Sequence, residues 1–332
     1  MLVRMVESVM GDDCPVCQQA ASLQVLHRFE QDPHYVVGCK VCTVQSILPH
    51  PTRAELREHY FNYQTTRTPD EQLPVLIERH GRLFEWLRTR WQVPSNKHIR
   101  YLEVGFGNGS SLLAAAQMGM DAVGYDLDPN NVADVQRRAE LLDVPVEVQR
   151  GDLNEAIEAR ERNEKFDFVK ASQLIEHVID PAKFIDSMSA LLAPRGYLYL
   201  DCPNNAASFL WIKNRLRRSF GRMDFYNSLR VNEHLWGFNH TSMNYLLRGR
   251  GFDVMFCTDY PVRHPFFQPE NRLWYPSLLS GLRLSVSERK LYPLLKSLIA
   301  AFDWTMSRTV SGGIGLAALA RKRDPEPSIT RH

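Results

Sequence analysis

The stretch that decides the fold of this 332-residue chain is Tyr101-Leu102-Glu103-Val104-Gly105-Phe106-Gly107-Asn108-Gly109-Ser110. An apolar run leads to an acidic residue, and three glycines then follow at alternate positions. An Ala- and Leu-rich segment from Ser111 to Met118 comes next and predicts a helix. Glycine allows a tight turn and a close approach of backbone to ligand, and a helix N-terminus presents free N–H groups. The stretch therefore predicts a strand, a ligand-binding loop and a helix in succession.

Two classes of ligand fit a glycine-rich loop after a strand. A dinucleotide loop needs the pattern G-x-G-x-x-G, but here the third glycine comes one residue early and Ser110 stands where glycine is needed. Glu103 would also repel a pyrophosphate. The stretch resembles motif I of the class I S-adenosylmethionine (SAM)-dependent methyltransferases, E/D-x-G-x-G-x-G. That resemblance implies that Glu103, Gly105, Gly107 and Gly109 bind SAM, whose ammonium group suits a carboxylate.

Two further acids follow the next two expected strands, residues 121–126 and 144–149. An acid at the end of the second strand can accept hydrogen bonds from ribose hydroxyls, which makes Asp126 the ribose candidate. The resemblance implies that Asp152, with Leu153 beside it, binds adenine. A plain turn role for Asp152 beside glycine is the alternative. Asp128 followed by Pro129 predicts the start of a helix.

A second block, residues 166–204, strengthens the resemblance. It contains a strand at 166–171, then Ser172, Glu176-His177-Val178, Asp180-Pro181, Pro194-Arg195-Gly196 and Pro203-Asn204. This order, with Glu233-His234-Leu235 further on, resembles small-molecule methyltransferases related to the ubiquinone-pathway O-methyltransferases. Arg195 departs from the usual glycine at a surface turn. Ser172 joins the expected SAM-binding residues, and the family's varied acceptors leave this chain's acceptor open.

The resemblance implies an α/β fold with a Rossmann-like seven-stranded sheet in the order 3-2-1-4-5-7-6, strand seven being antiparallel. Strand six is expected at 252–260, and residues 312–320 fit a final edge strand. His177 and His234 are the leading candidates for a catalytic base, because imidazole titrates near neutral pH. Each has a structural alternative: His177 could cap a helix, and His234 could bind a loop carbonyl.

Four of the six cysteines form two C-x-x-C pairs, Cys14/Cys17 and Cys39/Cys42, with 21 residues between them. Two such turns can complete a tetrahedral four-sulfur zinc site, and four thiolates leave no coordination position for water. Disulfides are the alternative, which a reducing cytoplasm disfavours. We therefore expect a structural zinc ribbon, with short strands at 23–28 and 34–38.

The expected organisation is a zinc ribbon at 1–50, a helical connector or lid at 51–95, a methyltransferase domain at 96–323 and a flexible tail at 324–332. Within the domain, residues 206–308 should bind the acceptor and carry helical insertions. The basic run at 209–223 is either a solvated face or a site for an acidic substrate group. The apolar helical stripe within 288–306 is either core or a contact with a membrane surface, and the role of the 266–308 insertion stays open.

Composition narrows the class of function. The chain is 44% hydrophobic and 23% charged, with a net charge of +2, which gives no electrostatic case for a nucleic-acid partner. Residues 1–10 lack a secretory apolar region, so a cytoplasmic location is expected. The favoured function is SAM-dependent methyl transfer to a small molecule, such as a sugar or another biosynthetic intermediate. The alternatives are an RNA methyltransferase that uses the ribbon to contact nucleic acid, and a non-catalytic SAM-binding interaction protein.

Overall fold

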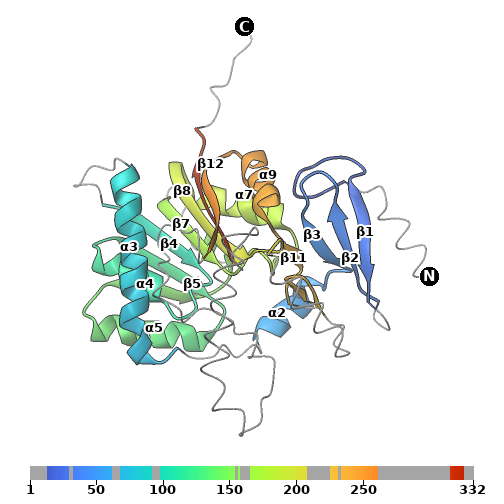
Figure 1. Cartoon of the computed structure of the whole chain (residues 1–332). Helices are drawn as coiled ribbons and strands as arrows, with labels where there is room; N and C mark the ends of the chain where they lie inside the picture. The colour runs from blue at the N-terminus through green and yellow to red at the C-terminus, as the bar shows by residue number, and fades with distance from the viewer. Residues whose placement is uncertain are drawn as a thin grey trace, which may run out of the picture.

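A computed structural model describes residues 13–29, 33–61, 68–91, 98–153, 156–157, 165–207, 225–230, 233–260 and 315–324 (Figure 1). The basic run at 209–223, the whole 266–308 insertion with its apolar stripe at 288–306, and residues 325–332 lie outside these ranges. Within them, no helix combines the length and apolar character needed to cross a bilayer.

A seven-stranded sheet forms the centre of the molecule, in the order β12-β13-β8-β7-β4-β5-β6. Its strands are β4 (Arg100–Val104), β5 (Asp121–Asp126), β6 (Val146–Arg150), β7 (Phe166–Ser172), β8 (Leu192–Pro203), β12 (Phe252–Tyr260) and β13 (Gly315–Lys322). Strands β4 to β8 run parallel, while β13 is antiparallel to both neighbours. Counted along the sheet this is the expected order 3-2-1-4-5-7-6, which confirms the predicted fold.

One expectation about this sheet is wrong. The last strand was expected at an edge, but β13 lies inside the sheet, where Leu316 pairs with Cys202 of β8 on one side and Asp259 of β12 on the other. Residues 315–320 of this strand are all buried. An unbroken run of apolar residues is typical of a strand covered on both faces, and that pattern distinguishes an inner strand from an edge strand.

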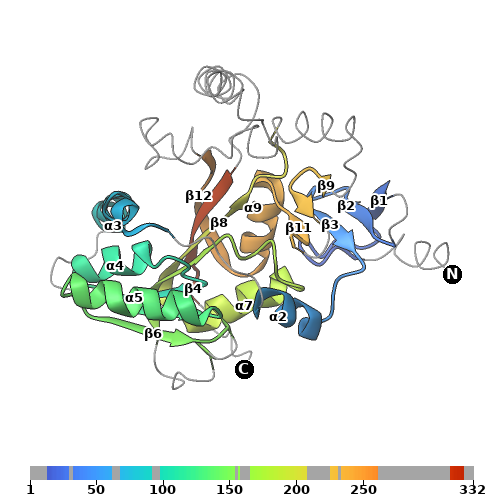
Figure 2. The ribbon, with the colours of Figure 1, turned by 90° about the horizontal axis from the view of Figure 1, so that it is seen from below.

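Helices cover both faces of the sheet (Figures 1 and 2). Helices α3 (Leu73–Trp91), α4 (Ser110–Gln117) and α5 (Pro129–Leu141) cover one face, and α7 (Pro181–Leu191) and α9 (His240–Gly249) cover the other. Alternate residues of β4 supply the two cores: Tyr101 packs with the α4 side, and Leu102 packs with the α7 side. The parallel strands are buried because both faces are covered.

Two helices start with an aspartate cap followed by proline. The side chain of Asp128 accepts a hydrogen bond from the Asn130 backbone N–H at 2.8 Å, and Pro129 occupies the first turn of α5. Asp180 and Pro181 do the same for α7, with Lys183 as the donor. These caps satisfy backbone groups that the helix cannot pair itself, and proline at the first position needs no partner. The predicted cap at Asp128 is confirmed.

A second, four-stranded sheet contains β1 (Leu23–Arg28), β2 (Tyr35–Cys39), β3 (Gln45–Leu48) and β11 (Trp236–Gly237), in that order. Its last strand comes from a part of the chain almost 200 residues beyond β3, after the short hairpin of β9 (Phe225–Tyr226) and β10 (Leu229–Arg230). The helical pattern from 53 to 91 is divided into α2 (Arg53–Phe61) and α3, with a 3₁₀ turn at Asp70–Gln72 just before α3.

Candidate functional site

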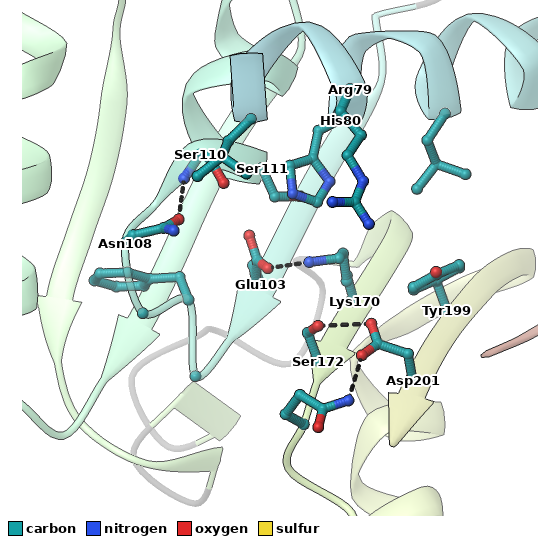
Figure 3. A pocket seen from close by; sticks show the side chains of 16 residues that line it. Arg79, His80, Glu103, Asn108, Ser110, Ser111, Lys170, Ser172, Tyr199 and Asp201 are labelled. Atoms are coloured by element: carbon teal, nitrogen blue, oxygen red, sulfur yellow. Dashed lines mark hydrogen bonds and ion pairs between the residues drawn. The ribbon is translucent and has the colours of Figure 1, made fainter. Parts of the chain in front are cut away.

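A cavity of about 220 Å³ lies at the carboxyl ends of β4 and β7, beneath α3 (Figure 3). Ligands bind at this edge in open α/β sheets, because the loops that leave the strands diverge there. Four of the residues expected to bind SAM line the cavity: Glu103, Gly105, Gly107 and Ser172. Gly109, Asp126, Asp152, Leu153 and both candidate histidines lie outside its lining.

The glycine loop needs glycine for backbone and packing reasons. Gly105, Gly107 and Gly109 have φ values of +69°, +54° and +72°, in the left-handed region that side chains disfavour. At Gly109 a Cβ atom would also lie 2.2 Å from Cγ2 of Val135 in α5. The loop can therefore lie close to α5 and expose its backbone to the cavity.

Asp126 is tied to this loop. Its Oδ2 accepts a hydrogen bond from the Gly107 N–H at 2.8 Å, and its Oδ1 accepts one from the Asp128 N–H at 2.9 Å. Burial raises the pKa of Asp126, although these bonds act in the opposite direction. Asp152 and Leu153 follow β6 and are half-buried, and the Gly151 N–H before them donates to the Asp126 carbonyl at 3.0 Å. The three predicted acids thus lie at the ends of three adjacent strands.

The partner of Glu103 was missed by the sequence analysis. Lys170 of β7 lies with its Nζ 2.5 Å from Oε1 of Glu103, and the two side chains are 3% and 2% exposed. The Tyr101 hydroxyl donates to Oε2 of Glu103 at 3.1 Å. Burial raises the pKa of Glu103, and the Lys170 charge lowers it again. The available signal was a lysine in the expected strand Phe166-Asp167-Phe168-Val169-Lys170-Ala171, at a position with an apolar residue on each side.

The far side of the cavity is polar. Asp201 of β8 accepts hydrogen bonds from the Ser172 hydroxyl at 2.6 Å and from the Gln173 side-chain amide at 2.8 Å. Arg79 and His80 reach the same space from α3 (Figure 3). Burial lowers the pKa of His80 well below its usual value, and the charges of Lys170 and Arg79 act in the same direction. The cavity therefore combines buried charges of both signs under one helix.

His177 and His234 lie together, near the same edge of the sheet. Their ring centroids are 4.8 Å apart. Nδ1 of His177 lies 2.8 Å from the Glu233 carbonyl, and Nδ1 of His234 lies 2.9 Å from the Ser228 carbonyl. A carbonyl can only accept, so each Nδ1 carries the proton and each Nε2 keeps a lone pair. Burial lowers the pKa of His177 to about 4 and also lowers that of His234. Both rings are therefore neutral at pH 7.

Glu176 is a third member of this group that the sequence analysis had not assigned a role. It is 1% exposed, and neither of its carboxylate oxygens has a hydrogen-bond partner among the described residues. Its Oε1 lies 3.7 Å from Nε2 of His177. A carboxylate oxygen of Glu176 and one ring nitrogen each of His177 and His234 all lie within 4.8 Å of one another. Burial raises the pKa of Glu176 well above its usual range. A proton that enters this group has three acceptors within reach.

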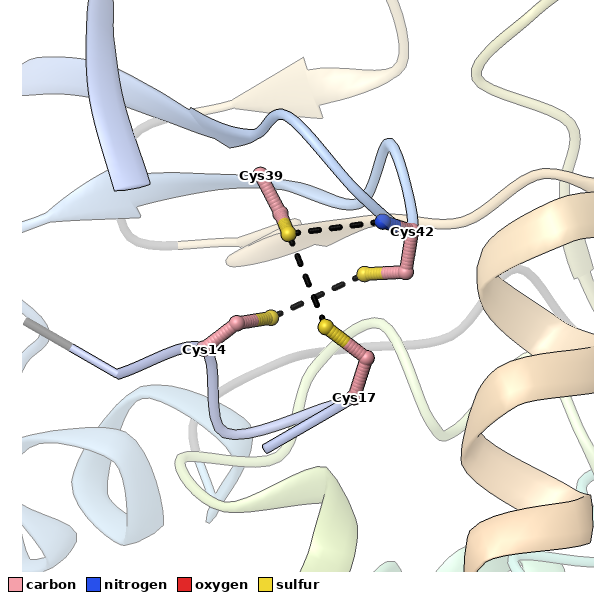
Figure 4. A group of neighbouring side chains, drawn as sticks. All are labelled: Cys14, Cys17, Cys39 and Cys42. Carbon is pink, nitrogen blue, oxygen red and sulfur yellow. Dashed lines mark hydrogen bonds between the residues drawn. The ribbon is translucent and has the colours of Figure 1, made fainter. Parts of the chain in front are cut away.

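The four cysteines predicted to bind zinc converge on one point (Figure 4). Their Sγ atoms all lie within 4.8 Å of one another, and the Cys14–Cys42 and Cys17–Cys39 pairs are each separated by 3.6 Å. That separation is too long for a disulfide bond of about 2.05 Å and fits a tetrahedron of sulfurs about 2.3 Å from a central ion. The Val41 and Cys42 N–H groups donate to Sγ of Cys39. The tetrad can therefore hold zinc with no coordination position left open.

Comparison with known proteins identifies one family. A family model described as a methyltransferase domain matches residues 75–255, more than half of the chain. Ubiquinone biosynthesis O-methyltransferases are similar in sequence: that of Azorhizobium caulinodans is 33% identical over 108 residues, covering 32% of this chain and 42% of the relative. That of Leptothrix cholodnii is 32% identical over 128 residues, covering 37% and 54%. The chain spans about half the length of these curated relatives.

Solved structures of similar shape were also found. Magnesium protoporphyrin IX methyltransferase from Synechocystis, solved with bound SAH, is 13% identical, with a TM-score of 0.45 over 81% of this chain and 94% of the other. A SAM-dependent methyltransferase from Archaeoglobus fulgidus is 14% identical, with a TM-score of 0.42 over 73% and 94%.

Proposed function

Because the chain belongs to the methyltransferase-domain family, we propose that it transfers a methyl group from SAM to a small-molecule acceptor, a sugar or another biosynthetic intermediate. The observation that carries this proposal is the hydrogen bond between Asp126 and the glycine loop, beside a cavity lined by Glu103. This bond supports the proposal because Asp126, which could accept a hydrogen bond from a ribose hydroxyl, then lies beside the glycine loop and the buried Glu103 carboxylate at one edge of the sheet.

The described residues fit SAM in three places. The Glu103 carboxylate lines the cavity where an ammonium group would be stabilised. Asp126 uses one hydrogen bond on Oδ2 within the chain, and a carboxylate oxygen has two lone pairs, so it can accept another from a ribose hydroxyl. We assign to Asp152, at the end of the next strand, the role of binding the adenine of SAM. Bound SAM would supply an activated methyl group to the acceptor.

The residues around the transfer site act by orienting the acceptor and by accepting its proton. Either His177 or His234 serves as the base, through the lone pair on its Nε2, since Nδ1 of each ring faces a carbonyl. A positioned base of this kind contributes about 10²–10⁴-fold to the rate. Where His177 is the base, Glu176 stabilises the proton on its ring, since Oε1 of Glu176 lies 3.7 Å from Nε2 of His177. The four cysteines are assigned to structural zinc.

Calorimetry with SAH tests the SAM site. Removal of a hydrogen bond to a charged acceptor costs about 1.5–3 kcal/mol, so Asp126→Ala should weaken SAH binding by about 10- to 150-fold. Asp253→Asn is the control, because Asp253 is 67% exposed on β12, at the far edge of the sheet. No measurable SAH binding by folded wild-type protein would reject the proposal, as would equal affinities for the Asp126 variant and wild type.

Release of SAH, the product left when SAM gives up its methyl group, identifies the class of acceptor. The wild-type protein, incubated with SAM and separate panels of nucleotide-linked sugars, free sugars and phenols, should release SAH with one panel. The same assay on His177→Asn and His234→Asn then assigns the base: the variant that loses about 10²-fold or more of the rate, with SAH affinity preserved, identifies it. Two variants with the wild-type rate would contradict the assignment of either histidine.

A further inference from the structure

The cysteine tetrad and His234 lie just before two strands, β3 and β11, that pair with each other. Strand β3 follows the tetrad directly and pairs with β11, so that Ser46 faces Trp236 and Gln45 faces Gly237. The Ser46 hydroxyl and the Ile47 N–H both donate to the Leu235 carbonyl, at 2.9 Å and 3.0 Å. Leu235 is the residue next to His234, so β3 determines where that backbone lies.

The other side of the same segment is bonded to the turn that follows β7. The Leu235 and Trp236 N–H groups donate to the Glu176 carbonyl at 2.8 Å and 3.1 Å, and the Trp236 indole donates to the Val178 carbonyl at 2.9 Å. Residues 233–237 therefore lie between the ribbon and the turn that carries His177. A shift of β3 would change the separation of the two histidine rings.

Two kinds of contact connect the cysteine tetrad to the segment that follows His234. Thr43 follows Cys42 directly, and the Asn239 side-chain amide donates to the Thr43 hydroxyl and carbonyl at 3.0 Å and 3.2 Å. Asn239 is also the cap of α9. Cys14, Cys39 and Cys42 pack in the same buried cluster as the side chains that follow His234, namely Leu235, Trp236 and Phe238. Hydrogen bonds and apolar packing thus both connect the ribbon turn to the loop.

We propose that the metal-bound ribbon is a positioning element for the methyl-transfer site: zinc fixes the turn at Cys39–Cys42, and through Thr43 and β3 this turn holds residues 233–239 and the His234 ring beside His177. The ribbon is then part of the site's geometry as well as of the fold. The inference rests on the proposed function in one respect, the role of His234. Ser46 and Thr43 become positioning residues, although neither lines the cavity.

Hydrogen–deuterium exchange on the full chain tests the proposal without an acceptor. The zinc-loaded protein is compared with protein treated with a chelator, and SAH binding is measured on both. We expect removal of zinc to speed exchange at the Leu235 and Trp236 amides by about tenfold or more, since their protection depends on this packing. Strand β5 should keep its protection, and SAH affinity should change by less than about threefold.

Two results would overturn the proposal. Unchanged exchange at residues 233–239 would show that the loop does not depend on the metal. Loss of protection throughout, β5 and SAH binding included, would show that the metal supports the whole fold and no particular segment. Failure of the proposed function gives a different result, because loaded protein would then fail to bind SAH while the exchange comparison still reports on the loop.

The Ser46→Ala variant tests the contact between the ribbon and Leu235 while the metal site stays intact. It removes the hydroxyl that donates to the Leu235 carbonyl and leaves the four cysteines in place. The variant should retain about one zinc per chain, yet exchange at Leu235 and Trp236 should rise, and the protected Nδ1–H signal of His234 should weaken in ¹⁵N spectra. Val41→Thr is the matched control, because Val41 is 41% exposed within the metal turn. Equal spectra for the two variants would contradict the positioning role.

Discussion

Replacing Lys170 with methionine removes the positive partner of a buried carboxylate and keeps the length of the side chain. The Lys170 and Glu103 charges lie 2.5 Å apart, and the side chains are 3% and 2% exposed. At an effective dielectric constant of about 20, two unit charges at that distance attract by about 7 kcal/mol, before the cost of removing both from water. Removing one partner leaves the other charge uncompensated, which costs about 3–5 kcal/mol. We expect the free energy of unfolding of Lys170→Met to be lower by about this amount at pH 8.

The loss of unfolding free energy in Lys170→Met should depend on pH. Burial already raises the pKa of Glu103 above its usual value of 4.5, and Lys170 acts in the opposite direction, so the Met variant raises it further. Between pH 4.5 and the raised value, the folded chain holds a proton that the unfolded chain has released, and stability therefore falls as pH increases. Urea unfolding at pH 5.5 and pH 8 should show a smaller deficit at pH 5.5.

Two further variants complete this test. Glu103→Gln combined with Lys170→Met removes both charges and should recover most of the lost stability. Lys183→Met is the control for loss of a lysine, because Lys183 is 75% exposed and its pair with Asp180 lies at the surface; its effect should be below about 0.5 kcal/mol. Equal stabilities of Lys170→Met and Lys183→Met at pH 8, or a deficit that does not change with pH, would refute the reasoning.

Three other predictions concern the fold around the site. Gly109→Ala should lower the free energy of unfolding by about 1–3 kcal/mol in urea titrations, because φ is +72° and the new Cβ would overlap Val135; wild-type stability would contradict the packing argument. Asp128→Ala should cost about 1 kcal/mol through loss of the α5 cap, and a urea midpoint equal to that of wild type would count against the cap. Burial holds the pKa of His50 at about 4, against 6.5 in the unfolded chain, so stability should fall by up to about 3 kcal/mol as pH drops from 6.5 to 4. His50→Gln should reduce that slope, and a slope unchanged in the variant would exclude His50 as its source.

The parts of the fold that local sequence determines were predictable. Strands β5 and β12 occupy the expected residues 121–126 and 252–260. The Asp128-Pro129 pair marks the start of α5, because a cap depends on residues within one turn. The glycine loop was identifiable because its backbone requirement falls on three alternate positions in a row.

Contacts between distant segments were not predictable in the same way. The Glu103–Lys170 pair depends on the register of two strands, and β11 is two residues long, too short to carry a pattern of its own. Glu176 and His234 meet because the loop after β10 folds back onto the end of β7, which no spacing in the chain indicates. The position of β13 required reading its unbroken apolar run as a sign of an inner strand.

The inner position of β13 has a consequence for the order in which the chain can fold. The sheet cannot be completed by adding strands in the order of synthesis, because β13 must enter between β8 and β12 after residues 261–314 have been made. Until then, β8 exposes the side of its backbone that will bond to β13, and such an open strand pairs readily with other chains. During synthesis, the protein should therefore be most prone to aggregate after residue 260 has emerged from the ribosome and before residue 322 has done so.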